Sequence, residues 1–123
     1  MAWKRVKKLT QPQKGSEFLS THTGASCLVF DSEGKTYLVV SGRDKENYSN
    51  LVLAPFNLNN MEIEGSFEFL MGPGHLGSFS DCGVSYPSIA SDGEKSFLFY
   101  AGWTQMVRVA FQNLHEINAN LLF

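Results

Sequence analysis

CLVFDSEGKTYLVVSGR, residues 27–43, and PSIASDGEKSFLFYAGW, residues 87–103, follow the same pattern. The two stretches align without a gap at an offset of 60 residues, with position 87 against position 27. In each, an apolar segment leads into a short polar turn, and a second apolar and aromatic segment follows. Asp and Gly tolerate the left-handed backbone of tight turns, and β-branched and aromatic residues favour strands. Each stretch therefore predicts a β-hairpin, and the pair predicts an internal repeat.

Further strands are predicted after each hairpin. Polar loops lead into apolar stretches at residues 51–56 and 107–112, and the last strand candidates lie at residues 59–71 and 114–123. Units of about 50 residues with several strands each are typical of β-propeller blades, which are four-stranded antiparallel sheets. We therefore predict an all-β fold with about two such antiparallel blades. An ordinary sandwich of two similar hairpins is the alternative.

The composition fits one small globular domain. Of the 123 residues, 43% are hydrophobic and 18% are charged, which supplies enough apolar side chains for a core. The ten Phe and 11 Gly residues favour strands and turns over helices. The net charge of -2 argues against nucleic acid as a partner.

The sequence also predicts a cytoplasmic protein with no membrane partner. Five of the ten basic residues lie within the first 14 positions, but a polar stretch follows them, so no signal peptide is expected. No run of about 18 apolar residues occurs, so no membrane span is expected. The two cysteines, Cys27 and Cys82, are too few for a disulfide framework and are predicted to be reduced thiols.

An ordered series of short motifs extends over the first 113 residues. It begins with MAWKRV, continues with His22 and with RDK at residues 43–45, and then reaches PGHLGSFSDCGVSYPS at residues 73–88. GW at residues 102–103 and VAFQN at residues 109–113 complete it. The series resembles the five-bladed β-propeller proteins related to glycoside hydrolases, the group that holds arabinanases, β-xylosidases and invertases. It is most similar to a bacterial branch of glycosidase-like proteins whose genes often lie among polysaccharide biosynthesis genes.

Four positions depart from the pattern of that family. Ser80 stands where the family has the first Asp of a pair, so that Asp81 alone remains. Cys82 replaces a Ser, Ala110 replaces a Pro, and Gln112 replaces an Arg. The loss of one Asp from the pair argues for weak hydrolytic activity or none.

The resemblance implies the N-terminal part of a propeller. The family continues into three further blades, whereas this sequence stops after residues 114–123. We therefore expect residues 1–123 to form a single N-terminal propeller fragment, an incomplete ring with blade-like repeats at about residues 22–71 and 82–123. A truncated gene product, a frame-shifted end and a genuine short protein are all compatible with the sequence.

Two aspartates are the candidate catalytic residues. Glycoside hydrolysis usually requires two carboxyl groups facing one sugar, one to protonate the leaving oxygen and the other to attack or to activate water. The resemblance implies that Asp44 and Asp81 are these groups. It also implies that Arg43 binds substrate, since a guanidinium group can hold a sugar hydroxyl or a carboxylate.

The remaining substrate-binding candidates are His22, Tyr86 and Trp103, which would supply hydrogen bonds and an aromatic platform. No paired spacing of His and Cys predicts a metal site, and no P-loop or similar motif predicts a cofactor.

Most of these candidates have a structural alternative that stays open on the sequence alone. Asp44 and Arg43 would close the loop as a salt bridge, and Asp81 would cap a turn. His22 would be a half-buried histidine with its hydrogen bonds satisfied, and Trp103 would belong to the core of a blade.

Two functions compete at this point. The first is a truncated glycoside-hydrolase-like β-propeller protein that acts on carbohydrate and is weak or inactive as an isolated chain. The second is a non-enzymatic interaction module that completes a propeller with another copy or chain. Exposed sheet edges recruit partners, so self-association through blade edges is expected in the second case.

Overall fold

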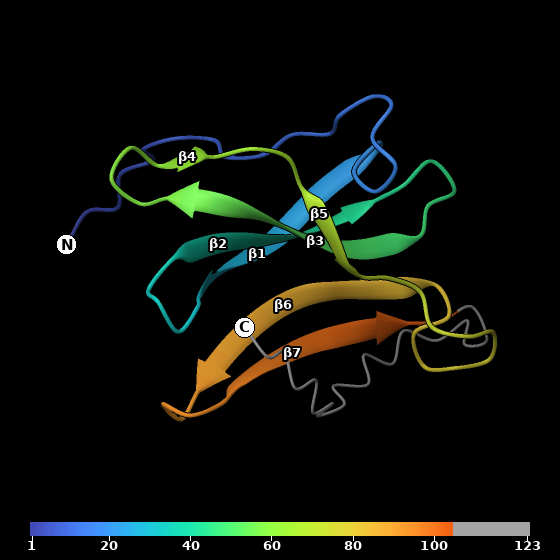
Figure 1. The fold of residues 1–123 in the computed structure, drawn as a ribbon. Coiled ribbons are helices and arrows are strands. Elements are labelled where there is room, and N and C mark those ends of the chain that lie inside the picture. Colours follow the sequence, from blue (N-terminus) through green and yellow to red (C-terminus); the bar gives the residue numbers. More distant parts are fainter. Residues whose placement is uncertain (105–123) are drawn as a thin grey trace.

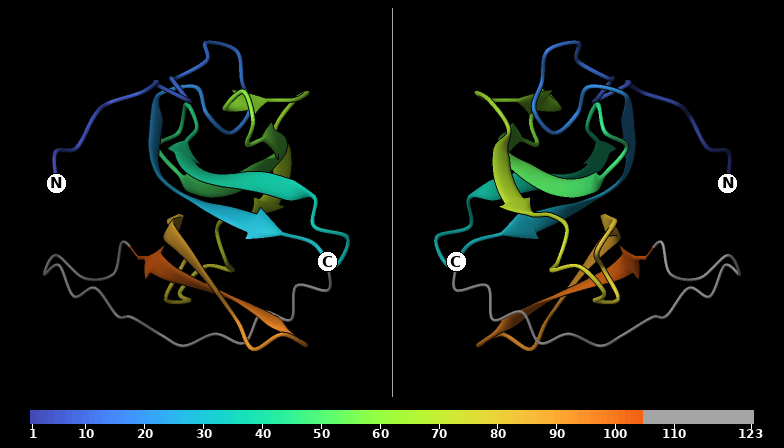
Figure 2. Two further views of the ribbon diagram at one scale, coloured as in Figure 1. Left: turned by 90° about the vertical axis from the view of Figure 1, so that its left-hand side faces the viewer. Right: turned by 90° about the vertical axis from the view of Figure 1, so that its right-hand side faces the viewer.

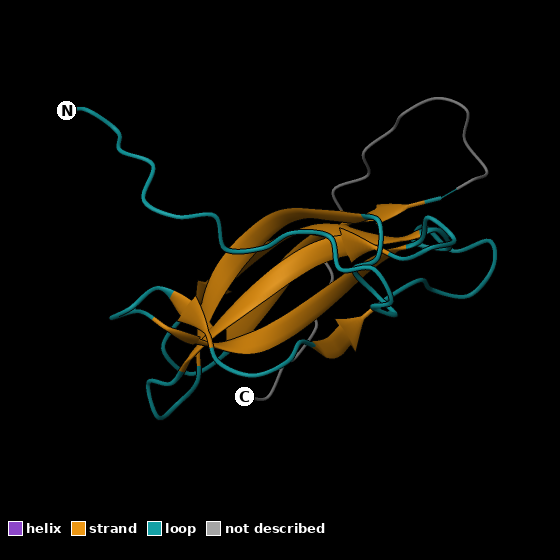
Figure 3. Ribbon diagram, turned by 90° about the horizontal axis from the view of Figure 1, so that it is seen from above, coloured by secondary structure: helices purple, strands orange, loops and turns teal. Residues whose placement is uncertain are grey.

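The computed structural model describes residues 1–104, and no helix occurs among them. The all-β prediction is therefore confirmed for this part of the chain (Figure 3). The strands are β1 (His22–Phe30), β2 (Thr36–Arg43), β3 (Ser49–Asn57), β4 (Glu62–Ile63), β5 (Glu68–Met71), β6 (Gly83–Ser91) and β7 (Ser96–Trp103).

Strands β1, β2, β3 and β5 form an antiparallel sheet in which each strand pairs with the next. The short strand β4 pairs with the far end of β3, at Phe56 and Asn57. The predicted fourth strand at residues 59–71 is thus divided, and Gly65 lies between its parts with φ of +95°. In the first repeat, β1, β2 and β3 are therefore consecutive antiparallel strands, and β4 and β5 each pair with β3.

Strands β6 and β7 form a second hairpin, which is joined to this sheet by one parallel pairing and also packs against it through a shared core. Ser49 at the start of β3 and Gly83 at the start of β6 make a single parallel pairing. In Figure 1 the hairpin lies below the β1–β2–β3 sheet, and the side views in Figure 2 show the two as separate layers.

The two hairpins share one register, with a difference of one residue in the turns. Leu28 pairs with Leu38 in the first hairpin, and Ile89 pairs with Leu98 in the second. First strands therefore correspond at an offset of 61 residues (89 against 28), and second strands at 60 (98 against 38). The ungapped sequence alignment is corrected accordingly, because the second turn is one residue shorter. Six of the seven paired positions of each hairpin then coincide, so the repeat extends to the hydrogen-bonded ladder.

An Asp side chain closes each turn. Asp31 Oδ1 accepts hydrogen bonds from the amides of Glu33 and Lys35, and Asp92 Oδ1 accepts them from the two residues that follow Gly93. The amides of Lys95 and Glu94 hold the pKa of the Asp92 carboxyl below its usual range. These interactions are Asx turns, which explains why both turns begin with Asp.

The two units, the sheet of β1–β5 and the β6–β7 hairpin, pack in the same direction, head to tail. Leu98 and Tyr100 of β7 share a core with Val39 on one face of the first sheet. Leu38 and Val40 are the counterparts of Leu98 and Tyr100, and they belong to a second core on the opposite face of that sheet. Each unit therefore buries the same side, as stacked repeats do.

The N-terminal segment covers this second core. Leu9, Phe18 and Leu19 pack there with Ile63 of β4. Figure 1 shows the segment running alongside β4, on the side of the sheet away from the β6–β7 hairpin. The segment thus covers the face of the sheet opposite the β6–β7 hairpin, and we call it the cap.

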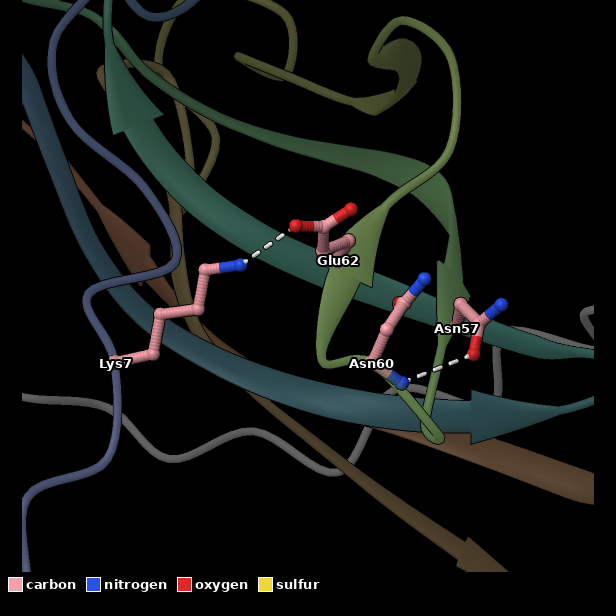
Figure 4. A network of polar contacts seen from close by, with 4 residues as sticks. All are labelled: Lys7, Asn57, Asn60 and Glu62. Carbon is pink, nitrogen blue, oxygen red and sulfur yellow. Dashed lines mark hydrogen bonds and ion pairs between the residues drawn. The ribbon is translucent and has the colours of Figure 1, made fainter.

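An ion pair joins this cap to β4 at the surface (Figure 4). Lys7 Nζ lies 3.1 Å from Glu62 Oε1, and both side chains are substantially exposed. The Asn60 amide donates to Asn57 Oδ1 at 3.3 Å and shapes the turn between β3 and β4. An exposed ion pair contributes at most about 1 kcal/mol, so the apolar contacts fix the segment.

Several predictions from the sequence fall outside the described residues. These are the strands at residues 107–112 and 114–123 and the VAFQN motif at residues 109–113. The closed arrangement of propeller blades likewise stays a prediction.

Residues 1–104 contain no helix long and apolar enough to cross a membrane.

Burial raises the pKa of the Cys27 thiol from 9.0 to about 11. At pH 8 the thiolate fraction is then about 90-fold lower than in the unfolded chain, and the thiolate is the reactive form. Alkylation of Cys27 by iodoacetamide, followed by peptide mass spectrometry, is expected to be correspondingly slow until the chain unfolds.

The same shift predicts how stability depends on pH. The pKa of Cys27 is higher in the folded chain than in the unfolded chain. The contribution of the protonated thiol to the free energy of unfolding is therefore complete below pH 9 and is lost as the pH rises through about 11. A Cys27→Ser variant is expected to lose this part of the pH dependence. An unchanged pH profile would show that burial does not perturb the thiol.

Candidate functional site

A cleft of about 240 Å³ lies where the two units meet. It is formed by the start of β1, the end of β2, the start of β3, the start of β6 and the end of β7. Four of the six site residues predicted from the sequence, His22, Arg43, Tyr86 and Trp103, line it. The other lining residues are Thr23, Gly24, Ala25, Ser41, Gly42, Ser49 and Ser85.

The repeat explains why these residues come together. His22 pairs with Arg43 across the first hairpin, and Gly83 pairs with Trp103 across the second. In the corrected register these pairs are counterparts, so Arg43 and Trp103 occupy equivalent places in the two units. The head-to-tail packing then places the two equivalent strand ends on the same cleft.

Both first strands carry a β-bulge at the cleft. The register of β1 shifts between Thr23 and Ser26, and that of β6 shifts between Ser85 and Ser88. The Ser41 hydroxyl donates to the Ala25 carbonyl oxygen at 3.0 Å and satisfies a backbone group of the first bulge. Bulges redirect side chains and are frequent beside functional sites.

Tyr86 lies within the second bulge in a left-handed backbone conformation, with φ of +56°. A bulky residue rarely adopts this conformation, and such strain is concentrated at binding and catalytic sites. Tyr86 is 54% exposed, and its ring centroid lies 6.1 Å from that of Trp103, with 48° between the ring planes. The bulge thus sets an exposed aromatic ring beside a second one at the cleft.

Arg43 and His22 add polar groups to the cleft. Arg43 Nη1 donates to Asn47 Oδ1 at 3.0 Å. His22 is exposed, and its Nδ1 lies 3.0 Å from the Thr21 hydroxyl. The Trp103 indole nitrogen is buried and has no hydrogen-bond partner within residues 1–104.

Asp44 does not line the cleft and instead closes the loop between β2 and β3. Its Oδ1 accepts from the amides of Glu46 and Tyr48, each at 3.0 Å, and its Oδ2 accepts from Asn50 Nδ2 at 3.3 Å. No ion pair joins Asp44 to Arg43 in the described part of the chain. Both carboxylate oxygens of Asp44 therefore serve the turn.

Asp81 is buried in the loop before β6 and also does not line the cleft. It is 9% exposed, and its Oδ2 accepts from the Gly77 amide at 3.0 Å. The carboxylate therefore shapes the Gly-rich loop at residues 72–82. Asp81 therefore fits the turn-capping alternative. Asp44 closes its loop through hydrogen bonds to Glu46, Tyr48 and Asn50 and not through the alternative salt bridge with Arg43. The catalytic role of both aspartates stays a prediction.

Residues that the sequence reasoning did not single out complete the site. Ser49 Oγ donates to the Val84 carbonyl oxygen at 2.7 Å and lies 2.5 Å from Ser85 Oγ, which joins the two units at the floor of the cleft. Asn47 orients Arg43 and has φ of +69°. Only the turn composition of the loop hinted at Asn47, and nothing in the sequence pointed to the serine pair.

Among residues 1–104, no group of three or more His, Cys, Asp or Glu side chains is placed to hold a metal ion. No family model matches this sequence, and no solved structure matches it.

Two proteins of Mycobacterium tuberculosis are similar to this chain, the uncharacterized proteins Rv1502 and MT1551, which come from two strains. Each is 28% identical over 115 residues, a match that covers 92% of this chain. The chain spans 38% of the length of these curated relatives. Because both are uncharacterized, functional inference depends on the cleft itself.

Proposed function

We propose that this chain is the carbohydrate-binding N-terminal portion of a glycoside-hydrolase-like β-propeller protein. The cleft between the two units receives the sugar, and the isolated chain has little or no hydrolytic activity. The observation that carries the proposal is the aromatic pair at the cleft, in which a strained bulge presents Tyr86 beside Trp103.

The chemistry of the cleft suits a sugar. A pyranose ring has an apolar C–H face that packs on aromatic rings and a rim of hydroxyls that requires hydrogen-bonding groups. Tyr86 and Trp103 supply the aromatic surface, while His22, Arg43 and Ser41 supply polar groups. Aromatic side chains with polar tips suit such mixed surfaces.

The positions of the aspartates support weak catalysis at most. A hydrolase needs two carboxyl groups within about 5–10 Å of each other across the scissile bond. None of the described residues lining the cleft is a carboxylate, and Asp44 and Asp81 both accept backbone hydrogen bonds. Robust hydrolysis of aryl glycosides, abolished by Asp44→Asn, would contradict this part of the proposal.

Removal of either ring is expected to weaken sugar binding. Loss of one stacking partner in a cleft costs about 1–2 kcal/mol, or about tenfold in affinity. The Tyr86→Ala and Trp103→Ala variants would be compared with the unchanged chain on a glycan array, followed by isothermal titration of the best ligand.

Phe30→Ala is the matched control. Phe30 is as exposed as Tyr86, at 54%, but it lies at the far end of β1 and does not line the cleft. Its replacement should leave affinity unchanged. Equal losses in all three variants would point to a general effect on folding, and no binding to any glycan would remove the proposal.

A second candidate function is an interaction module that completes a propeller with another copy or chain. Phe99 is the counterpart of Val39, which is fully buried between the units, yet Phe99 is 38% exposed. The outward face of β7 thus matches a face that receives a neighbouring unit in the first repeat. Light scattering behind size-exclusion chromatography tests this, since a monomer at all concentrations would argue against it.

A further inference from the structure

We propose that the cleft selects acidic sugars, with Arg43 receiving the carboxylate of a uronic acid while the Tyr86 and Trp103 rings contact the sugar face. This inference rests on the proposed carbohydrate-binding function and adds the chemical class of the ligand.

The charge distribution in the cleft points to an anionic ligand. Among the described lining residues, Arg43 alone carries a permanent charge, and His22 is the other titratable group besides the Tyr86 phenol. The nearby carboxylate of Asp44 is engaged by two backbone amides and the Asn50 side chain. A neutral sugar would leave the guanidinium without a charged partner, whereas a carboxylate binds it in a bidentate manner.

The loop after β2 holds the guanidinium in place. Asp44 fixes the turn through its three hydrogen bonds, and the Asn47 amide donates to the Asp44 carbonyl oxygen at 3.1 Å. Asn47 adopts a left-handed conformation that Asn tolerates, and its side-chain oxygen accepts from Arg43 Nη1. This contact uses one of five guanidinium donors, so the others remain for a ligand.

The same geometry gives Asp44 and Asn47 a positioning role. A braced guanidinium loses less conformational entropy on binding than a mobile one, which raises affinity without a new contact. Loss of the brace should therefore weaken acidic ligands more than neutral ones. A purely structural role for the loop would reduce the affinity for both classes equally.

The test compares three trimers by isothermal titration with the full chain. They are a galacturonic acid trimer, the neutral galactose trimer, and a glutamate tripeptide that carries carboxylates without sugar rings. We expect the acidic sugar to bind about tenfold or more tightly than the neutral one, as a charge-assisted pair implies. Arg43→Gln should abolish the preference, and Arg43→Lys should retain part of it.

Asn47→Ala should weaken the acidic sugar about threefold more than the neutral one, because the guanidinium loses its brace. Equal affinity for both sugars would overturn the acidic selectivity while leaving carbohydrate binding intact. Failure of the folded chain to bind either trimer would also overturn the acidic selectivity, and the proposed function would fall with it if no glycan on the array were bound. Binding of the glutamate tripeptide as tightly as the acidic sugar would overturn the assignment to sugars.

Discussion

Replacement of Gly83 with alanine is expected to destabilise the fold by about 4 kcal/mol or more, which is a large part of the roughly 5–15 kcal/mol that stabilises a folded domain. Gly83 has φ of +120°, and a Cβ atom there would lie 2.5 Å from the Ser49 nitrogen and closer still to its carbonyl oxygen. These are backbone atoms of the neighbouring sheet, so no side-chain rotation relieves the overlap. The strand pairing that joins the two units would have to separate.

Gly77→Ala is the matched control for this effect. Gly77 also has a positive φ, of +83°, but a Cβ atom at that position would meet nothing within 4 Å. It should cost only the backbone strain of a left-handed residue, about 1–2 kcal/mol. Urea denaturation monitored by circular dichroism would measure the free energy of unfolding of both variants. Similar losses in the two would show that the close approach at Gly83 does not hold the units together.

The fold could be predicted from sequence to the level of the individual unit. The turn residues and the aromatic and β-branched segments define both hairpins, and the strands at residues 49–57 and 62–71 follow the predicted order. The one-residue difference between the turns could not be predicted, because SDGEK at residues 91–95 aligns without a gap with DSEGK at residues 31–35. In the structure Ser91 belongs to β6, so that only residues 92–95 form the second turn. Only the hydrogen-bonded ladder decides the offset.

The site could be predicted in part, for a physical reason. His22 and Arg43 meet because they are cross-strand partners, and hairpin pairing is readable from sequence. The location of the Asp44 carboxylate is not readable, since an Asp before a polar loop is equally typical of an Asx turn and of an active site. Whether the Asp closes a turn or faces a ligand depends on which backbone donors lie near it, and here two amides donate to the Asp44 carboxylate.

The head-to-tail packing of the units predicts a large loss of stability on substitution at one position of β7 and a small loss at the adjacent position. Leu98 is 1% exposed and belongs to the core between the units, whereas its neighbour Phe99 points to the other side of the strand and is 38% exposed. Leu98→Ala should lower the free energy of unfolding by about 2–5 kcal/mol, because a buried cavity replaces the side chain. Phe99→Ala should lower it by about 1 kcal/mol or less.

The second variant also separates stability from association. If the outward face of β7 receives another unit, Phe99→Ala should reduce any concentration-dependent mass seen by light scattering, while Leu98→Ala should not reduce it at temperatures where the variant stays folded. Chemical denaturation and light scattering on the same two proteins supply both readouts. A larger stability loss for Phe99→Ala than for Leu98→Ala would reverse the assignment of the two faces and with it the correspondence between the repeats.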